Sequence, residues 1–303
     1  MVWIFFSFSL EAWCSGEKES GKSSGFNPSE ILIKGKVNYG GGKCALGLRY
    51  FNRIRDNVVS INEWWQDPRN RFDYYFYRGE ALYYLDRYEE AIRALDSIIS
   101  NKDIYESVRD EEMLEVYFLI GILYLQEGLY QQAIDSCGEV EKSFDITNGG
   151  EFYIDPFETA DLFYYIGKAY FHLGLYQQSA EYFSKVFYTV EYVVEDGLAE
   201  AIFDASGYNI ADVYYLRGVS YFLLGNYTQA IVDFHVITQS TDEWYVSWLE
   251  NVTNHENIMY YSAEAIAASS TNASANIASF SGSFLHNGIM AVFDPLGCHP
   301  IGP

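Results

Sequence analysis

The sequence predicts an all-α protein built from stacked helical hairpins, in the form of a solenoid. One pattern recurs four times along the 303 residues, and such self-similarity is typical of repeat architectures. Within each copy, apolar and small residues recur at helical spacing on both sides of a short break. With 49% hydrophobic residues, the chain can bury a substantial core.

The four copies align on a glycine that falls inside the expected first helix of each hairpin. An aromatic residue lies four positions before it, a tyrosine nine after it, a small residue twelve after it, and large or apolar residues sixteen and nineteen after it. We call these the repeat glycines: Gly79, Gly121, Gly167 and Gly218. A mid-helix glycine costs roughly 1 kcal/mol against alanine, so we expect the second helix to touch the first there.

The breaks within the hairpins also share a feature. Gly128, Gly174 and Gly225 can supply the left-handed conformation that ends a helix, whereas Asp86 takes this place in the first copy. Because one hairpin cannot bury both its faces, neighbouring hairpins must stack. The predicted repeats lie near 72–99, 114–141, 160–187 and 211–238, with a degenerate fifth at 256–268 in which Ala263 replaces the glycine.

This pattern resembles the tetratricopeptide repeat (TPR) family over roughly residues 72–240. The repeat glycines lie 42, 46 and 51 residues apart, whereas the ordinary repeat is about 34 residues long. We therefore expect long insertions between repeats, which either lengthen the helices or form loops on one edge. The sequence also departs from the family at Asp86, at Ser179 in place of alanine, and in lacking the usual terminal proline.

The N-terminus resembles a bacterial lipoprotein leader. Residues 2–10 are apolar but too few to span a bilayer, and Cys14 then opens a hydrophilic run. This order predicts a signal at 1–14, acylation of Cys14 and a periplasmic, lipid-anchored protein of the bacterial envelope. Against it, no Lys or Arg precedes the apolar run and Trp13 is large for its place. The alternative is a buried N-terminal segment of a cytoplasmic protein.

The remaining flanks are assigned by composition. Residues 15–43 are expected to be a flexible tether and linker, because they are rich in Ser, Gly and charge and end in three glycines. The solenoid is expected over 44–268, beginning with a capping helix at 44–65. Residues 269–303 turn to Ser, Ala, Asn and Gly and form a C-terminal extension.

Charge limits the classes of partner. The chain has 42 acidic and 19 basic residues, a net charge of −23, and no basic stripe. This balance disfavours nucleic acid and anionic membranes and favours a basic partner. Four cysteines, none in a Cys-x-x-Cys pair, predict neither a zinc site nor a disulfide framework, and Cys137 takes an apolar repeat position.

The sequence predicts no catalytic residue, cofactor or metal, and so no enzyme. Residues 16–23 fit the phosphate-loop pattern G-x-x-x-x-G-K-[ST], but Pro28 follows before a helix could cradle phosphates. We interpret the match as part of the tether. A nucleotide-binding enzyme stays as a minor hypothesis.

The resemblance to the TPR family implies where a partner would bind. In that family the first helices line a concave groove that holds a peptide or helix of another protein. The corresponding residues here are Phe76, Tyr83, Phe118, Leu125, Tyr164, Lys168, Phe171, Tyr215 and Phe222. Such an aromatic groove suits an apolar peptide or an amphipathic helix, and the function expected is a non-enzymatic interaction scaffold. Two alternatives are a carrier of an apolar small ligand and a groove filled by the chain's own tail.

An acidic residue lies six positions before each repeat glycine. These are Asp73, Glu115, Asp161 and Asp212. Helix N-termini favour acidic residues through capping and the macrodipole, which is the structural interpretation. The functional interpretation is an acidic lip that attracts a basic partner.

Overall fold

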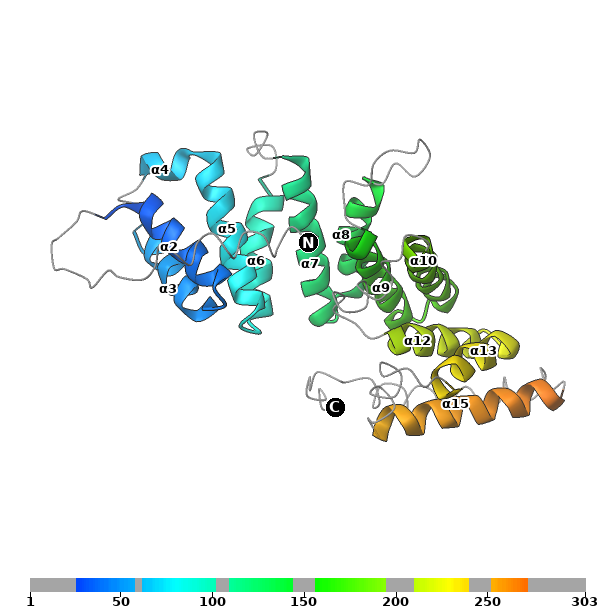
Figure 1. The fold of residues 1–303 in the computed structure, drawn as a ribbon. Helices are drawn as coiled ribbons and strands as arrows, with labels where there is room; N and C mark the ends of the chain where they lie inside the picture. The colour runs from blue at the N-terminus through cyan, green and yellow to red at the C-terminus, as the bar shows by residue number, and fades with distance from the viewer. Residues whose placement is uncertain are drawn as a thin grey trace, which may run out of the picture. The chain divides into compact units, whose positions relative to one another are not determined.

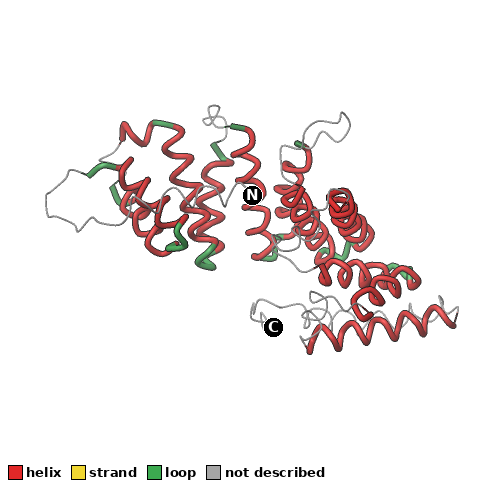
Figure 2. Tube along the Cα trace, viewed as in Figure 1, coloured by secondary structure: helices red, strands yellow, loops and turns green. Residues whose placement is uncertain are grey.

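The protein, seen in a computed structural model, is described over residues 26–57, 62–101, 109–143, 156–194, 210–239 and 252–271. Within these ranges it forms twelve helices and no strand (Figures 1 and 2). The predicted all-α class is therefore confirmed. The chain divides into two compact units, residues 1–153 and 154–303, each described by itself below. Of the helices described, none is both long and apolar enough to cross a membrane.

Unit 1 is a row of three hairpins with one short helix inserted. Its helices are α2 (Pro28–Gly40), α3 (Cys44–Arg55), α4 (Asn62–Gln66), α5 (Pro68–Tyr83), α6 (Tyr88–Ile99), α7 (Asp110–Gln126) and α8 (Tyr130–Lys142). The hairpins are α2–α3, α5–α6 and α7–α8 (Figure 1). The second helix of each hairpin packs on the first helix of the next, and two apolar clusters each join neighbouring hairpins.

Unit 2 has two hairpins and a long closing helix. Its helices are α9 (Pro156–His172), α10 (Tyr176–Val194), α12 (Ile210–Leu223), α13 (Tyr227–Gln239) and α15 (Val252–Thr271). The helix α15 packs on α13 and α12, as the first helix of a further repeat would. The predicted degenerate fifth repeat lies on this helix. Helix α10 runs past residue 187, so part of one insertion lengthens a helix.

The apolar positions predicted sixteen and nineteen residues after each repeat glycine are all in the core. They are Leu95, Ile98, Cys137, Val140, Phe183, Val186, Phe234 and Ile237, and none is more than 2% exposed. Each repeat glycine faces the residue sixteen positions later. A β-carbon at Gly79 or Gly218 would lie less than 3.0 Å from the side chain of Leu95 or Phe234. The glycines thus let the two helices of a hairpin approach closely.

The hairpin turns share one backbone geometry. The residue seven after each repeat glycine has a positive φ: 55° for Asp86 and 73°, 74° and 79° for Gly128, Gly174 and Gly225. The next residue donates its N–H to a carbonyl five residues back, as from Leu129 to Tyr124 at 2.8 Å. This is the bond that ends a helix on a left-handed residue, and it confirms the turn predicted from glycine.

A fifth hairpin of the same kind precedes the predicted ones. Gly35 packs on Phe51, which is sixteen residues after it. Gly42, which is seven residues after Gly35, has φ 74°. Lys43 donates to the carbonyl of Asn38 at 2.8 Å, so the turn is the same as in the later hairpins. The prediction of a linker over 15–43 is wrong for residues 28–40. The three glycines that suggested a linker instead close this hairpin turn.

The predicted capping helix over 44–65 is also corrected. Helix α3 ends at Arg55, and α4 begins separately at Asn62. The two helices that begin with a proline, α2 and α5, are each preceded by a residue whose side chain caps the helix. Asn27 accepts a hydrogen bond from the backbone of Glu30 before α2, and Asp67 accepts one from the backbone of Arg69 before α5. In both helices proline occupies the first turn, where its missing N–H costs nothing.

Candidate functional site

The residues predicted to line a groove lie on the first helices of the hairpins. They are on α5 and α7 in unit 1 and on α9 and α12 in unit 2. Positions three before, one after and four after a glycine are spaced four and three residues apart, so they share one side of a helix. Within each unit, we call the surface formed by these positions, with the acidic residues six before each glycine, the groove face of that unit.

The groove face is less open than the sequence suggested. Phe76, Leu125, Tyr164, Phe171 and Tyr215 are buried, with at most 7% of each exposed. Tyr83, Phe118, Lys168 and Phe222 are half-buried. The first group therefore mainly supports packing between helices, and the second presents side chains at the surface.

Lys36 and Asp73 join the first two hairpins across this face. The Lys36 ammonium donates to Asp73 Oδ2 at 2.6 Å and lies 4.3 Å from the centre of the Tyr77 ring. Arg69 Nη2 lies 3.0 Å from the other carboxylate oxygen. Asp73 is 8% exposed, so the two cations compensate a buried charge.

Lys168 and Asp212 occupy the same two repeat positions in unit 2. Each lysine is one residue after a repeat glycine, and each aspartate is six before the next one. Asp212 Oδ2 accepts a hydrogen bond from the Tyr164 hydroxyl at 3.1 Å, which ties α9 to α12. Burial lowers the pKa of Lys168, and the charge of Asp212 opposes this shift.

Two carboxylates face each other at the corresponding place between α5 and α7. Glu80 follows Gly79 by one residue, and Glu115 precedes Gly121 by six. Burial raises the pKa of Glu80 to about 8, a hydrogen bond with Tyr39 opposes the rise, and the charge of Glu115 adds to it. Glu80 therefore holds a proton at neutral pH.

His172 adds a neutral base to the groove face of unit 2. It lies one turn after Lys168 on α9. Burial lowers its pKa to about 4, and the nearby charge of Lys168 lowers it further. Among the residues described, no three His, Cys, Asp or Glu side chains come together as metal ligands.

The structure separates the two interpretations of the acidic column. Asp212 lies in the first turn of α12, where capping applies. Asp73, Glu115 and Asp161 do not, because α5 begins at Pro68, α7 at Asp110 and α9 at Pro156. For these three the helix-terminus interpretation is wrong. Asp73 instead pairs with the preceding hairpin, and Glu115 is exposed next to Glu80.

The end of the groove face in unit 2 is covered by α15. The Tyr261 ring lies 6.3 Å from that of Tyr215 and 5.4 Å from that of Phe222, both nearly edge-on. This contact is part of the packing between the last hairpin and the next helix. Cys14, the predicted lipidation site, lies outside the described residues.

Two groove-face residues were missed from the sequence. Lys36 was missed because its hairpin was taken for a linker, although Gly35, Gly42 and Phe51 have the repeat spacing. Tyr39, four residues after Gly35, was missed for the same reason. Its side chain is buried and contacts Glu80 of the next hairpin.

Comparisons with known proteins agree with this geometry. Two family models described as tetratricopeptide repeat match the chain, one over residues 78–144 and one over residues 212–240. A search of curated proteins finds no match.

Solved structures with a similar fold have low sequence identity. One is the signal-transduction ATPase with a tetratricopeptide repeat sensor, PH0952, from Pyrococcus horikoshii, at 19% identity and a TM-score of 0.52. The match covers 79% of this chain and 36% of that one. MamA matches at 16% identity and a TM-score of 0.45, covering 66% of this chain and 90% of MamA. The recurrent hairpins and the two family matches together identify the chain as a tetratricopeptide-repeat protein.

Proposed function

We propose that this protein is a non-enzymatic scaffold that holds a peptide or helix of another protein against its groove face. Tetratricopeptide repeats are in general interaction scaffolds rather than enzymes. The proposal rests on one observation about where the repeats agree and where they differ. Core positions hold the same kinds of side chain in every repeat, whereas one position of the groove face, directly after the repeat glycine, does not.

The variation is greatest one residue after the repeat glycine. Lysine, glutamate, isoleucine, lysine and valine follow the five glycines in turn. Glu80, Ile122 and Val219 are buried, whereas Lys36 and Lys168 are partly exposed, so the two lysines are the members of this set that reach the surface. A surface whose side chains differ from repeat to repeat can select among partners.

The groove face favours a partner with apolar and basic side chains. Tyr83, Phe118 and Phe222 each present part of an aromatic ring, which suits the apolar side of an amphipathic helix. Near Tyr83, Glu80 and Glu115 place two carboxyl groups close together. A Lys or Arg of the partner beside these two groups would favour ionisation of Glu80.

Affinity capture with paired variants tests this proposal. We expect Tyr83→Ala and Phe222→Ala each to reduce recovery of a partner from native cells by about tenfold or more, as for aromatic residues central to an interface. Tyr188→Ala, which truncates a 73% exposed ring on α10, is the control and should leave recovery unchanged. Equal recovery by all three variants would exclude the groove face as the binding surface.

The carrier of an apolar small ligand is the alternative use of this face. Native mass spectrometry after mild purification distinguishes the two, because a co-purifying small molecule favours the carrier and a co-purifying protein the scaffold. We also propose an envelope location through acylation of Cys14. An intact mass that begins at Cys14 and includes acyl chains would support it, and an unmodified chain retaining Met1 would favour a cytoplasmic scaffold.

A further inference from the structure

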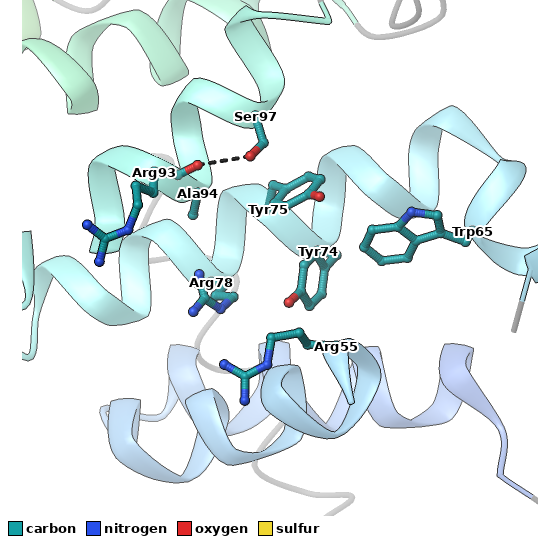
Figure 3. Close-up of a pocket in the computed structure, with 8 residues that line it drawn as sticks. All are labelled: Arg55, Trp65, Tyr74, Tyr75, Arg78, Arg93, Ala94 and Ser97. Atoms are coloured by element: carbon teal, nitrogen blue, oxygen red, sulfur yellow. Dashed lines mark hydrogen bonds between the residues drawn. The ribbon is translucent and has the colours of Figure 1, made fainter. Parts of the chain in front are cut away.

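A pocket of about 410 Å³ lies in unit 1 between α3, α4, α5 and α6 (Figure 3). Its lining residues are Arg55, Trp65, Tyr74, Tyr75, Arg78, Arg93, Ala94 and Ser97. Three of these eight are arginines and none is acidic, although the chain has more than twice as many acidic as basic residues. The lining therefore has a charge opposite to that of the protein as a whole.

The pocket is distinct from the groove face. Both use side chains of α5, but an α-helix turns about 100° per residue. Tyr74 and Arg78 therefore lie on the side of α5 opposite Phe76, Glu80 and Tyr83. A ligand in the pocket would not occupy the surface proposed to hold the partner helix.

The surrounding chain is much less acidic than the rest. Residues 26–101 contain eleven basic and ten acidic residues, whereas residues 144–303 contain three basic and nineteen acidic ones. The eleven basic residues include the three lining arginines, so the charge of this part of the chain is nearly balanced. An anion would meet little of the repulsion that the net charge of −23 implies.

Arg78 has donor capacity that its neighbours do not use. Its side chain is 12% exposed, and its Nη2 lies 3.8 Å from Glu90 Oε2, a long distance for an ion pair. Its Nε is buried without a hydrogen-bond partner. A buried donor without a partner destabilises the folded protein, and a bound anion would offset that loss.

Within the described part of the chain, the ion pairs of Arg55 and Arg93 are with exposed acids close to them in the sequence. Arg55 Nε lies 2.9 Å from Asp56, and Arg93 Nη1 lies 3.5 Å from Glu89. Exposed pairs of this kind contribute little to stability, so both arginines can exchange partners at little cost. Two exposed guanidinium groups and one largely buried group suit a carboxylate.

The pocket's other wall is aromatic. Trp65 meets Tyr74 and Tyr75 edge-on, with ring centres 5.1 and 5.7 Å apart. The Tyr74 hydroxyl points toward Arg55 (Figure 3). Burial raises the pKa of Tyr74 to about 12, partly offset by Arg78 and Arg55, so it keeps its proton and can donate to an anion at neutral pH.

We propose that this pocket binds the carboxylate of a glutamate or aspartate in an acidic segment of a partner protein. The arginines and the Tyr74 hydroxyl donate to the carboxylate, and the rings of Trp65 and Tyr75 contact its aliphatic stem. Since the two surfaces are separate, the site does not depend on the groove face being a binding surface.

Fluorescence anisotropy with a fluorescein-labelled hexaglutamate peptide tests the proposal on the full chain. We expect saturable binding, weakened about fivefold or more by Arg55→Gln and by Arg93→Gln, since each removes a charge-assisted hydrogen bond. Both side chains are more than half exposed, so neither substitution should unfold the protein. Arg53→Gln is the matched control, because it removes the same charge from exposed α3 surface outside the lining.

Three results would overturn the proposal. One is no binding of the peptide. Another is an equal loss of affinity with Arg53→Gln, which would mean general electrostatic attraction rather than a site. The third is displacement of the peptide by inorganic phosphate at lower concentration than by glutarate, which would assign the pocket to a free phosphate group.

Discussion

Lys36 Nζ lies 2.6 Å from Asp73 Oδ2, and this ion pair joins the hairpin α2–α3 to the hairpin α5–α6. Lys168 and Asp212 hold the corresponding positions between α9 and α12. At the same place between α5 and α7, Glu80 and Glu115 are two acids. One structural position between successive hairpins therefore carries either a lysine and an acid or two acids, and its pairing affects stability differently in each case.

The first prediction concerns the Lys36–Asp73 pair. Lys36→Ala should lower the free energy of unfolding by about 1–3 kcal/mol, because it removes a charge-assisted hydrogen bond from a buried carboxylate. Lys34→Ala on the same helix should change it by less than about 1 kcal/mol, since Lys34 and its partner Glu30 are about half exposed. Urea unfolding measures both. Equal effects would show that the pair contributes no more than a surface contact.

The second prediction compares two glycines in the hairpin α7–α8. Gly121→Ala should destabilise the protein by about 1 kcal/mol or more, because overpacking against Cys137 outweighs the gain in helix propensity. Gly138→Ala should stabilise it by about 1 kcal/mol, because no atom lies within 4 Å of a β-carbon there. Thermal unfolding compared with the wild type checks both signs. A stabilising Gly121→Ala would contradict the role assigned to the repeat glycines.

The third prediction concerns the turn at Asp86, which has φ 55° where later hairpins have glycine. Asp86→Ala should be less stable than Asp86→Gly by about 1 kcal/mol, because alanine is strained in the left-handed region. Both variants lose the hydrogen bond from the Tyr88 hydroxyl, so their difference isolates the backbone. Urea unfolding measures the difference, and equal midpoints for Asp86→Ala and Asp86→Gly would exclude this explanation.

The fourth prediction is a pH dependence due to Glu80. Its pKa is about 8 in the folded protein against 4.5 ordinarily, so between these values the folded state binds a proton that the unfolded state has lost. Stability from this group is therefore complete below about pH 4.5 and falls as the pH rises toward 8.

Glu80→Gln should remove that dependence. Its melting temperature should exceed that of the wild type at pH 8 and match it near pH 4.5, because glutamine never ionises. Glu89→Gln, at a 76% exposed side chain on α6, is the control and should follow the wild type at every pH. Parallel melting curves for wild type and Glu80→Gln would show that Glu80 ionises normally.

The core could be predicted from the sequence because it repeats. Each hairpin needs a close contact at the glycine, an apolar residue sixteen positions on and a left-handed residue at the turn. Four copies of these requirements reveal the pattern even where one copy departs from it, as at Asp86. Local packing rules therefore determine most of the fold.

The first hairpin was not predicted because its composition differs from that of the other copies. Gly35 is followed at twelve residues by Gly47 rather than alanine, and at nine by Cys44 rather than tyrosine. Three successive glycines also suggested a linker. Only the spacing of Gly35, Gly42 and Phe51 shows the repeat, and that spacing is evident once the turn geometry is known.

The charges of the groove face were beyond prediction for a different reason. Whether Glu80 meets a lysine or another acid depends on which residues of successive hairpins face each other, and these residues are far apart in the sequence. Similarly, the pocket of Figure 3 combines side chains from four helices, and no single segment marks it. Contacts between repeats require the structure.

Site-specific photo-crosslinking tests the central claim most directly. A benzophenone amino acid would replace Tyr83 or Phe222 on the groove face. The control position is Val232, which is 58% exposed on α13, the second helix of its hairpin. In native cells we expect both groove-face positions to crosslink to one and the same protein, and Val232 not to. Crosslinking from Val232 alone, or equally from all three positions, would contradict a scaffold that binds its partner through the groove face.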